Sequence, residues 1–191
     1  MTPVTVISGG QTGVDTAALL AAEAFSLPIS GYVPLHYSNE LGSYSIPERF
    51  RADLVETDTT ASALRTELNI KQADGVLTLL SAEDGRSDVS KGTQLGIDYA
   101  RALGKVENQL CFVDLTSLDL DADVERVVRW LVDRKVSKCA IGGPRESEVP
   151  GIERQAETFL LKVFDLLENI SKASEHNTAK TASSSDLQVN G

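Results

Sequence analysis

A glycine-rich turn between an apolar run and an alanine-rich run is the sequence feature that most constrains the fold. The turn is Ser8-Gly9-Gly10-Gln11-Thr12-Gly13-Val14-Asp15. Residues 4–7 before it are all β-branched, which predicts a short central strand of a parallel sheet. Residues 15–25 after it predict a helix. Glycines let backbone approach a ligand closely, and N–H groups at a helix start can bind an anion. We therefore expect the turn to form the floor of a binding site.

Apolar runs and helical patterns alternate along the rest of the chain. We expect further strands at 29–33, 76–80, 110–113 and 136–141, and helices at 59–72, 94–103, 121–134 and 151–170. Residues 34–56 have the composition of a loop, and their tyrosines and the Ile46–Phe50 run favour an ordered one. This alternation predicts an α/β fold with a mostly parallel sheet and helices on both faces.

The length of 191 residues predicts one domain with a tail. We expect residues 1–170 to form the ligand-binding domain. Residues 171–191 are rich in Ser, Thr, Ala and Asn, which predicts a disordered C-terminal tail.

The formal net charge of −10 limits the class of partner. In the tail, Lys172 and Lys180 cancel Glu175 and Asp186, so the charge belongs to the expected domain. Such a surface disfavours nucleic acid and acidic membranes, which both bind through basic surfaces. A site for a small anion must then depend on backbone donors and a few placed cations.

Cysteine and histidine are both scarce. Cys111 and Cys139 lie in apolar runs and are expected as buried thiols. His36 and His176 are the two histidines, so no four-ligand set for structural zinc exists, and no metal site is expected. No apolar run approaches the roughly 20 residues of a membrane span, and no secretory signal is evident. These features predict a cytoplasmic protein.

Polar turns follow four of the expected strands, and in a parallel sheet such turns meet at the carboxyl edge, where ligands bind. A lone Gly-Gly turn is more often only a turn, but three glycine-containing turns at one edge favour a site. The predicted ligand-binding residues are Gly9, Gly10, Gln11, Thr12, Gly13, Asp15, Ser81, Lys91, Gly92, Thr93, Gly143 and Arg145.

Several of these residues also have a purely structural interpretation. Asp15 can cap the first helix. Lys91 is either a surface lysine or a cation beside helix N–H groups. Arg145 either pairs with Glu146 or Glu148 or binds a ligand oxyanion with its planar guanidinium.

The first turn matches neither common nucleotide motif. Its spacing is G-G-x-x-G, and Val33-Pro34-Leu35 stands where a ribose-binding acid would follow the second strand. The Gly-Lys-Ser/Thr ending of a P-loop is also missing. A dinucleotide dehydrogenase and an ATPase are therefore disfavoured.

The turn, with Ala17-Ala18-Leu19, resembles the opening of the molybdenum carrier family, within the Rossmann-like group that includes the lonely-guy (lysine decarboxylase-like) phosphoribohydrolases. The resemblance covers roughly residues 4–167. It continues in order through Gly31-Tyr32-Val33-Pro34, Ile46-Pro47-Glu48-Arg49, Arg65-Thr66-Glu67-Leu68-Asn69, Ala73-Asp74-Gly75, Lys91-Gly92-Thr93, Gly142-Gly143-Pro144-Arg145-Glu146-Ser147 and Pro150-Gly151-Ile152. It implies a single Rossmann-like domain, a homo-oligomer, and a carboxyl-edge pocket for a phosphate-bearing ligand. The molybdenum cofactor, a pterin with a dithiolene and a phosphate, is the ligand proposed for that family.

The sequence departs from the related patterns at three places. Thr16 stands where an arginine commonly follows the aspartate, and residues 35–40 replace a basic segment. Gly96 falls where the phosphoribohydrolases carry their catalytic glutamate. The first two departures bear on the identity or affinity of the ligand, and the third disfavours cleavage of nucleotides by that route. The donor-rich turns and the shortage of catalytic groups favour a small-molecule binding or carrier protein, for the molybdenum cofactor or another phosphate-bearing pterin or nucleotide.

The alternative function is a phosphoribohydrolase-type hydrolysis of a nucleoside monophosphate. Glu48, Asp15 or Glu146 would then have to supply the acid–base group. A scaffold without a ligand is the least favoured interpretation, because three polar turns gather at one edge.

Overall fold

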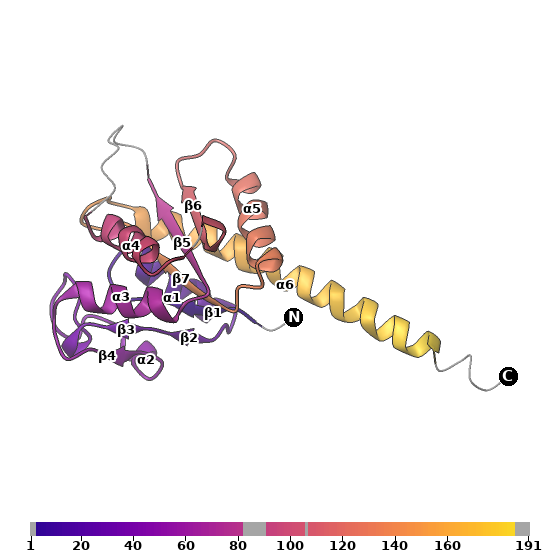
Figure 1. Ribbon diagram of the computed structural model, residues 1–191, viewed down its shortest axis with the longest axis horizontal. Coiled ribbons are helices and arrows are strands. Elements are labelled where there is room, and N and C mark those ends of the chain that lie inside the picture. Colours follow the sequence, from indigo (N-terminus) through magenta and orange to yellow (C-terminus); the bar gives the residue numbers. More distant parts are fainter. Residues whose placement is uncertain (1–2, 82–90, 106, 186–191) are drawn as a thin grey trace.

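A five-stranded, all-parallel sheet forms the centre of the protein (Figure 1). The computed structural model describes residues 3–81, 91–105 and 107–185. The strands in spatial order are β2 (Ile29–Ser30), β1 (Thr5–Ile7), β7 (Lys138–Gly142), β5 (Gly75–Leu80) and β6 (Leu110–Asp114). The last strand in sequence therefore lies between the first strand and β5. This position brings the loop after β7 beside the glycine-rich turn after β1.

Helices cover both faces of the sheet, as the sequence predicted. One face carries α1 (Val14–Ala24), α5 (Leu120–Asp133) and α6 (Ile152–Ser185), and the other carries α3 (Ser62–Gln72) and α4 (Lys91–Ala102). Side chains alternate between the faces along each strand. Val6 joins the core under α1 and α6, while the next residue, Ile7, packs with Ile70 of α3 and Ala100 of α4.

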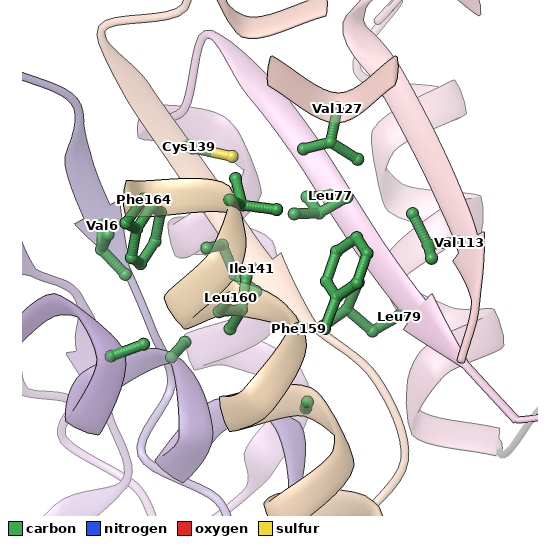
Figure 2. Close-up of a cluster of buried hydrophobic side chains, with 14 of the residues drawn as sticks. Val6, Leu77, Leu79, Val113, Val127, Cys139, Ile141, Phe159, Leu160 and Phe164 are labelled. Carbon is green, nitrogen blue, oxygen red and sulfur yellow. The ribbon is translucent and has the colours of Figure 1, made fainter. Parts of the chain in front are cut away.

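The larger core lies between the sheet and the α1, α5 and α6 layer. Figure 2 shows Phe159, Leu160 and Phe164 of α6 among strand side chains that include Leu77 and Ile141. On α1, four alanines are fully buried: Ala17, Ala18, Ala21 and Ala22. These small side chains let α1 and α6 approach each other closely. The result is a three-layer α/β/α domain of the Rossmann-like type.

The expected strand 29–33 is divided between two sheets. β2 ends at Ser30, and β3 (Tyr32–Val33) pairs in parallel with β4 (Val55–Glu56) to form a second, two-stranded sheet. The chain crosses between the sheets at Gly31, where a Cβ atom would lie 2.0 Å from the Ser8 carbonyl oxygen. Only glycine allows this close approach.

Residues 34–56 are ordered and contain short elements that the sequence pattern did not predict. The 3₁₀ turn η1 (Leu35–Tyr37) and the one-turn helix α2 (Glu48–Arg51) precede β4. A third apolar cluster fixes this region against α1. Its buried members are Leu19, Val33, Ile46, Phe50 and Leu54.

Helix α6 extends past the expected domain boundary. Disorder was expected from Ser171, but the structure continues the helix to Ser185 (Figure 1). Residues 152–185 contain no glycine or proline to end it. Among the residues of α6 whose side chains are described, Ile170 is the last that packs against the core, and Lys172, Ala173 and Ser174 are exposed. A 3₁₀ turn, η2 (Glu107–Gln109), precedes β6.

Within the described part of the chain, no helix combines the length and apolar character that crossing a membrane requires.

Candidate functional site

A cavity lies at the carboxyl ends of β1, β5 and β7, beneath α3 and α4. Its floor includes Ile7, Thr78 and Gly142, and its wall includes Ser62, Arg65, Thr66 and Asn69 of α3. Its volume is about 90 Å³, and a cavity needs roughly 10–15 Å³ to hold one water. The enclosed space therefore accommodates several waters or one oxyanion group.

The structure brings seven of the twelve predicted residues together around this cavity. They are Gly9, Gln11, Asp15, Gly92, Thr93, Gly143 and Arg145. They come from three separate segments: the turn after β1 with the start of α1, the first turn of α4, and the loop after β7. Lys91 is the first residue of α4, and the position of its side chain lies outside the described part of the structure.

Four predicted residues lie outside the cavity lining. Gly10 packs against Ile46, and Gly13 packs against the backbone of Pro144 to Glu146. The Thr12 hydroxyl donates to a carboxylate oxygen of Glu40. The Ser81 hydroxyl is buried and has no hydrogen-bond partner among the described residues.

The N–H donors of the glycine-rich turn are engaged by side chains of the protein itself. Gln11 N–H donates to Oδ2 of Asp15 at 3.2 Å, and Thr12 N–H donates to Oε1 of Gln11 at 3.0 Å. Gly13 N–H donates to Oε2 of Glu153, from α6, at 3.1 Å. Asp15 and Glu153 therefore accept hydrogen bonds from backbone N–H groups that we expected to bind a ligand. Asp15 does not act as the side-chain cap of α1, whose N-cap is Gly13.

Arg65 is a cation of the cavity that the predicted set of ligand-binding residues did not include. Its Nη1 lies 2.8 Å from Oδ2 of Asp15, and the two side chains are 14% and 7% exposed. Its Nε is buried and has no hydrogen-bond partner among the described residues. A guanidinium has five N–H donors. Among the described residues Asp15 is its one hydrogen-bond partner, and the Arg65 side chain lines the cavity.

Helix α3 is held in register by Asn69, one turn beyond Arg65. The Asn69 side chain accepts from Tyr32 N–H at 2.7 Å and donates to the Tyr32 carbonyl at 2.9 Å. Arg65 and Asn69 belong to one segment of the family resemblance, Arg65-Thr66-Glu67-Leu68-Asn69. That segment was the signal in the sequence that could have identified them.

Arg145 lies at the cavity without the partners considered for it. Its backbone N–H donates to Oε2 of Glu148 at 3.0 Å. Among the described residues, no hydrogen bond or ion pair holds its side chain, and its charge acts on Glu40. Of the two interpretations from the sequence, pairing with Glu146 or Glu148 is therefore not the arrangement observed.

Of the three candidate acid–base groups, only Asp15 lines the cavity. Glu146 accepts from Gly151 N–H and Glu153 N–H at the start of α6, at 2.5 and 3.0 Å. Glu48 is exposed at the start of α2. Gly96 stands where the phosphoribohydrolases carry their catalytic glutamate. It does line the cavity, but it offers no side chain there.

No group of three or more His, Cys, Asp or Glu side chains gathers in the described ranges in a way that could hold a metal ion. The two cysteines lie elsewhere, buried in strands β6 and β7 as free thiols.

The comparisons with known proteins agree with this architecture. A crystal structure of a putative molybdenum carrier protein from Syntrophus aciditrophicus is similar, with a TM-score of 0.73 and 29% sequence identity. The similarity covers 85% of this chain and 95% of that chain. No curated protein sequence matches this chain. The model of the circularly permutated YpsA SLOG family matches residues 6–164. The chain therefore belongs to the circularly permutated YpsA SLOG family, as its resemblance to the molybdenum carriers predicted.

Proposed function

We propose that the protein binds a small phosphate-bearing molecule, with the phosphate at Arg65. The observation that carries this proposal is a largely buried guanidinium in a cavity, paired on one side with Asp15 and with Nε unpartnered among the described residues. A buried donor without a partner costs free energy, which an incoming oxyanion would recover. Planar guanidinium groups suit phosphate oxygens, which they bind in pairs.

The local charge of the site matters because the protein as a whole repels anions. The formal net charge is −10, and such a field slows the approach of an anion. Arg65 and Arg145 line the cavity as its cations, beside the carboxylates of Asp15 and Glu148. The ligand is then held by short-range contacts rather than by long-range attraction.

We further propose that the ligand is the molybdenum cofactor or another phosphate-bearing pterin or nucleotide. A similar protein carries the name of a molybdenum carrier, which supports this class. The cavity fits the phosphate end of such a ligand, because the guanidinium groups of Arg65 and Arg145 both line it. Bound there, the cofactor would keep its own dithiolene as the ligand of molybdenum, so a carrier needs no metal-binding side chains.

A binding role is favoured over hydrolysis. Gly96 lies at the cavity where the phosphoribohydrolases carry glutamate, and Asp15 is engaged by Arg65 and the Gln11 N–H. The protein is expected to release no free base from nucleoside monophosphates above the uncatalysed rate. Release above that rate, abolished by Asp15→Asn, would instead support the hydrolase.

Titration calorimetry with inorganic phosphate and with a nucleoside monophosphate tests the proposal. Arg65→Met should weaken binding at least tenfold. Arg129→Met removes an equal charge from an exposed position on α5 and is the matched control. Mass spectrometry and metal analysis of gently purified protein would identify a retained ligand. Failure of the wild-type protein to bind either probe, together with no retained phosphate-bearing ligand, would refute the proposal.

A further inference from the structure

Glu40 places its carboxylate among donors from two separate loops. The Thr12 hydroxyl donates to Oε1 and the Ser147 hydroxyl donates to Oε2. The Ser147 N–H also points at Oε1, at 3.4 Å. Thr12 follows β1 and Ser147 follows β7, so the carboxylate joins the two turns that meet at the carboxyl edge of the sheet.

The charge around Glu40 favours an anion. Partial burial raises the pKa of Glu40, but the hydrogen bonds from Ser147 and Thr12 and the charge of Arg145 outweigh it. The pKa of Glu40 is therefore held below its ordinary value, and the group is ionised at neutral pH. The surroundings are thus built to accept negative charge.

Thr12, Ser147 and Arg145 surround the Glu40 carboxylate as a cradle, and this cradle adjoins the Arg65 cavity. Arg145 lines the cavity and acts on Glu40, and Gln11 lines the cavity and accepts from Glu40 N–H at 3.0 Å. A ligand with one anionic group at Arg65 thus has a second set of donors beside it, occupied by a side chain of the protein.

Polar contacts, and not core packing, hold the segment that carries Glu40. Leu41 and Tyr44 are 76% and 59% exposed, so neither contributes to the core. Asn39 and Gly42 pair with each other, and the Asn39 amide donates to the Gly10 carbonyl at 3.3 Å. Glu40 could leave the cradle without exposing a buried apolar side chain, because the next core residue is Ile46.

We propose that the cradle of Thr12, Ser147 and Arg145 is a second anion subsite, and that the Glu40 carboxylate occupies it until an oxyanion of the ligand replaces it. The ligand class is then a small molecule with two anionic groups, at least one of them a phosphate. This inference rests on the proposed function for its first anionic contact. Glu40 lowers the affinity for anions by competing for the donors.

Titration of inorganic phosphate and pyrophosphate into full-length variants tests the subsite. Glu40→Ala should bind phosphate at least tenfold more tightly than the wild type. Glu40→Gln should gain less, because its amide oxygen still accepts one of the hydroxyl donors. Glu125→Gln removes the same charge from an exposed position on α5 and should change the affinity less than twofold. Ser147→Ala in the Glu40→Ala background should abolish most of the gain.

The same titrations separate the subsite from the proposed function. If Glu40→Ala gains phosphate binding in an Arg65→Met background, the gain belongs to the cradle even if binding at Arg65 is refuted. If the gain requires Arg65, Glu40 acts only through its charge and the subsite is refuted. Folded Glu40 variants that bind phosphate no more tightly than the wild type also refute it. Failure of both Glu40 variants to fold, monitored by circular dichroism, would identify Glu40 as a structural tether and overturn the proposal.

Discussion

The Nη1 atom of Arg65 lies 2.8 Å from Oδ2 of Asp15, and the two residues are 50 positions apart in the sequence. The pair joins α3, on one face of the sheet, to the start of α1, on the other. It crosses the carboxyl edge directly above Gly9, where a Cβ atom would lie 1.8 Å from the same Nη1. The absence of a side chain at Gly9 is therefore what leaves space for the ion pair.

Gly9→Ala is expected to displace the Arg65 guanidinium from Asp15. The clash involves the far end of a flexible side chain, so the fold should survive with a loss of about 1–3 kcal/mol, the cost of leaving a buried polar group unpaired. Phosphate affinity should fall as it does in Arg65→Met. Urea denaturation and phosphate titration measure the two effects. The same methyl at Gly96 would meet its nearest atoms at 3.6 and 3.7 Å, so Gly96→Ala should raise stability by about 0.5–1 kcal/mol. Unchanged phosphate binding in Gly9→Ala would contradict the placement of Arg65.

Asp15→Asn should separate stability from ligand binding. The substitution leaves a largely buried guanidinium without its counter-charge, which costs about 3 kcal/mol. The same change removes a negative charge from the cavity, so phosphate affinity should rise. Denaturation and titration of this one variant test both expectations. A variant that lost stability and phosphate binding together would indicate that Asp15 itself contacts the ligand.

Much of the fold was predictable because local patterns determined it. Short apolar runs predicted the strands, and their alternation with helices predicted a parallel sheet with both faces covered. Motifs after strands predicted the carboxyl-edge site, where seven of the predicted residues lie.

Long-range pairings were not predictable in this way. Nothing local indicates that β7 lies between β1 and β5, or that Arg65 reaches Asp15 across the sheet. The sequence also did not indicate that Asp15, Glu40 and Glu153 accept from the turn after β1, because acidic side chains there have many alternative partners. The division of strand 29–33 depended on the contact between Gly31 and Ser8, which no periodicity encodes.

Asp74 should make stability depend on pH in the acid range. Its Oδ2 accepts from Ser137 N–H, the Ser137 hydroxyl and Lys138 N–H at 3.2, 2.5 and 3.0 Å, which ties β5 to the start of β7. Burial raises the pKa of Asp74, but these bonds and the Lys138 charge outweigh it and hold the pKa below its ordinary value of 3.8. A carboxyl whose pKa is lower in the folded state stabilises the fold above the unfolded value, and this contribution is lost as the pH falls through the folded value.

Asp74→Asn is therefore expected to lower the free energy of unfolding by roughly 1 kcal/mol at pH 7. The difference from the wild type should stay constant down to about pH 5 and shrink below pH 4. Urea denaturation at pH 7, 5 and 3 measures it. Glu40 titrates in the same acid range but is present in both proteins, so its effect cancels in the difference. A difference that persisted unchanged at pH 3 would show that the ionised carboxylate is not the stabilising form.

Cys111 and Cys139 are expected to resist thiol reagents in the folded protein. They are 5% and 2% exposed, and burial raises the pKa of both thiols. A guanidinium N–H of Arg126 donates to the Cys111 sulfur at 3.4 Å, which only partly offsets the effect of burial. Because the thiolate is the reactive form, Ellman's reagent should label neither thiol at pH 8 and both in denaturant. In denaturant, the Cys111→Ser variant should have one thiol that Ellman's reagent labels instead of two. Rapid labelling of either thiol in the native protein would contradict the buried positions.

The far end of α6 is expected to contribute little to stability. Leu166, Leu167 and Ile170 pack against the core, whereas Lys172 to Ser174 are exposed. A chain ended after Ala173 should unfold within about 0.5 kcal/mol of the full chain. A chain ended after Phe164 loses three partly buried apolar side chains and should lose about 3 kcal/mol or more. Backbone amides of residues 174–185 should exchange hydrogen rapidly in the full chain, since an isolated helix shorter than about 12–15 residues is only marginally stable in water. Protection of these amides, or a large loss of stability on ending the chain after Ala173, would place the domain boundary beyond residue 170.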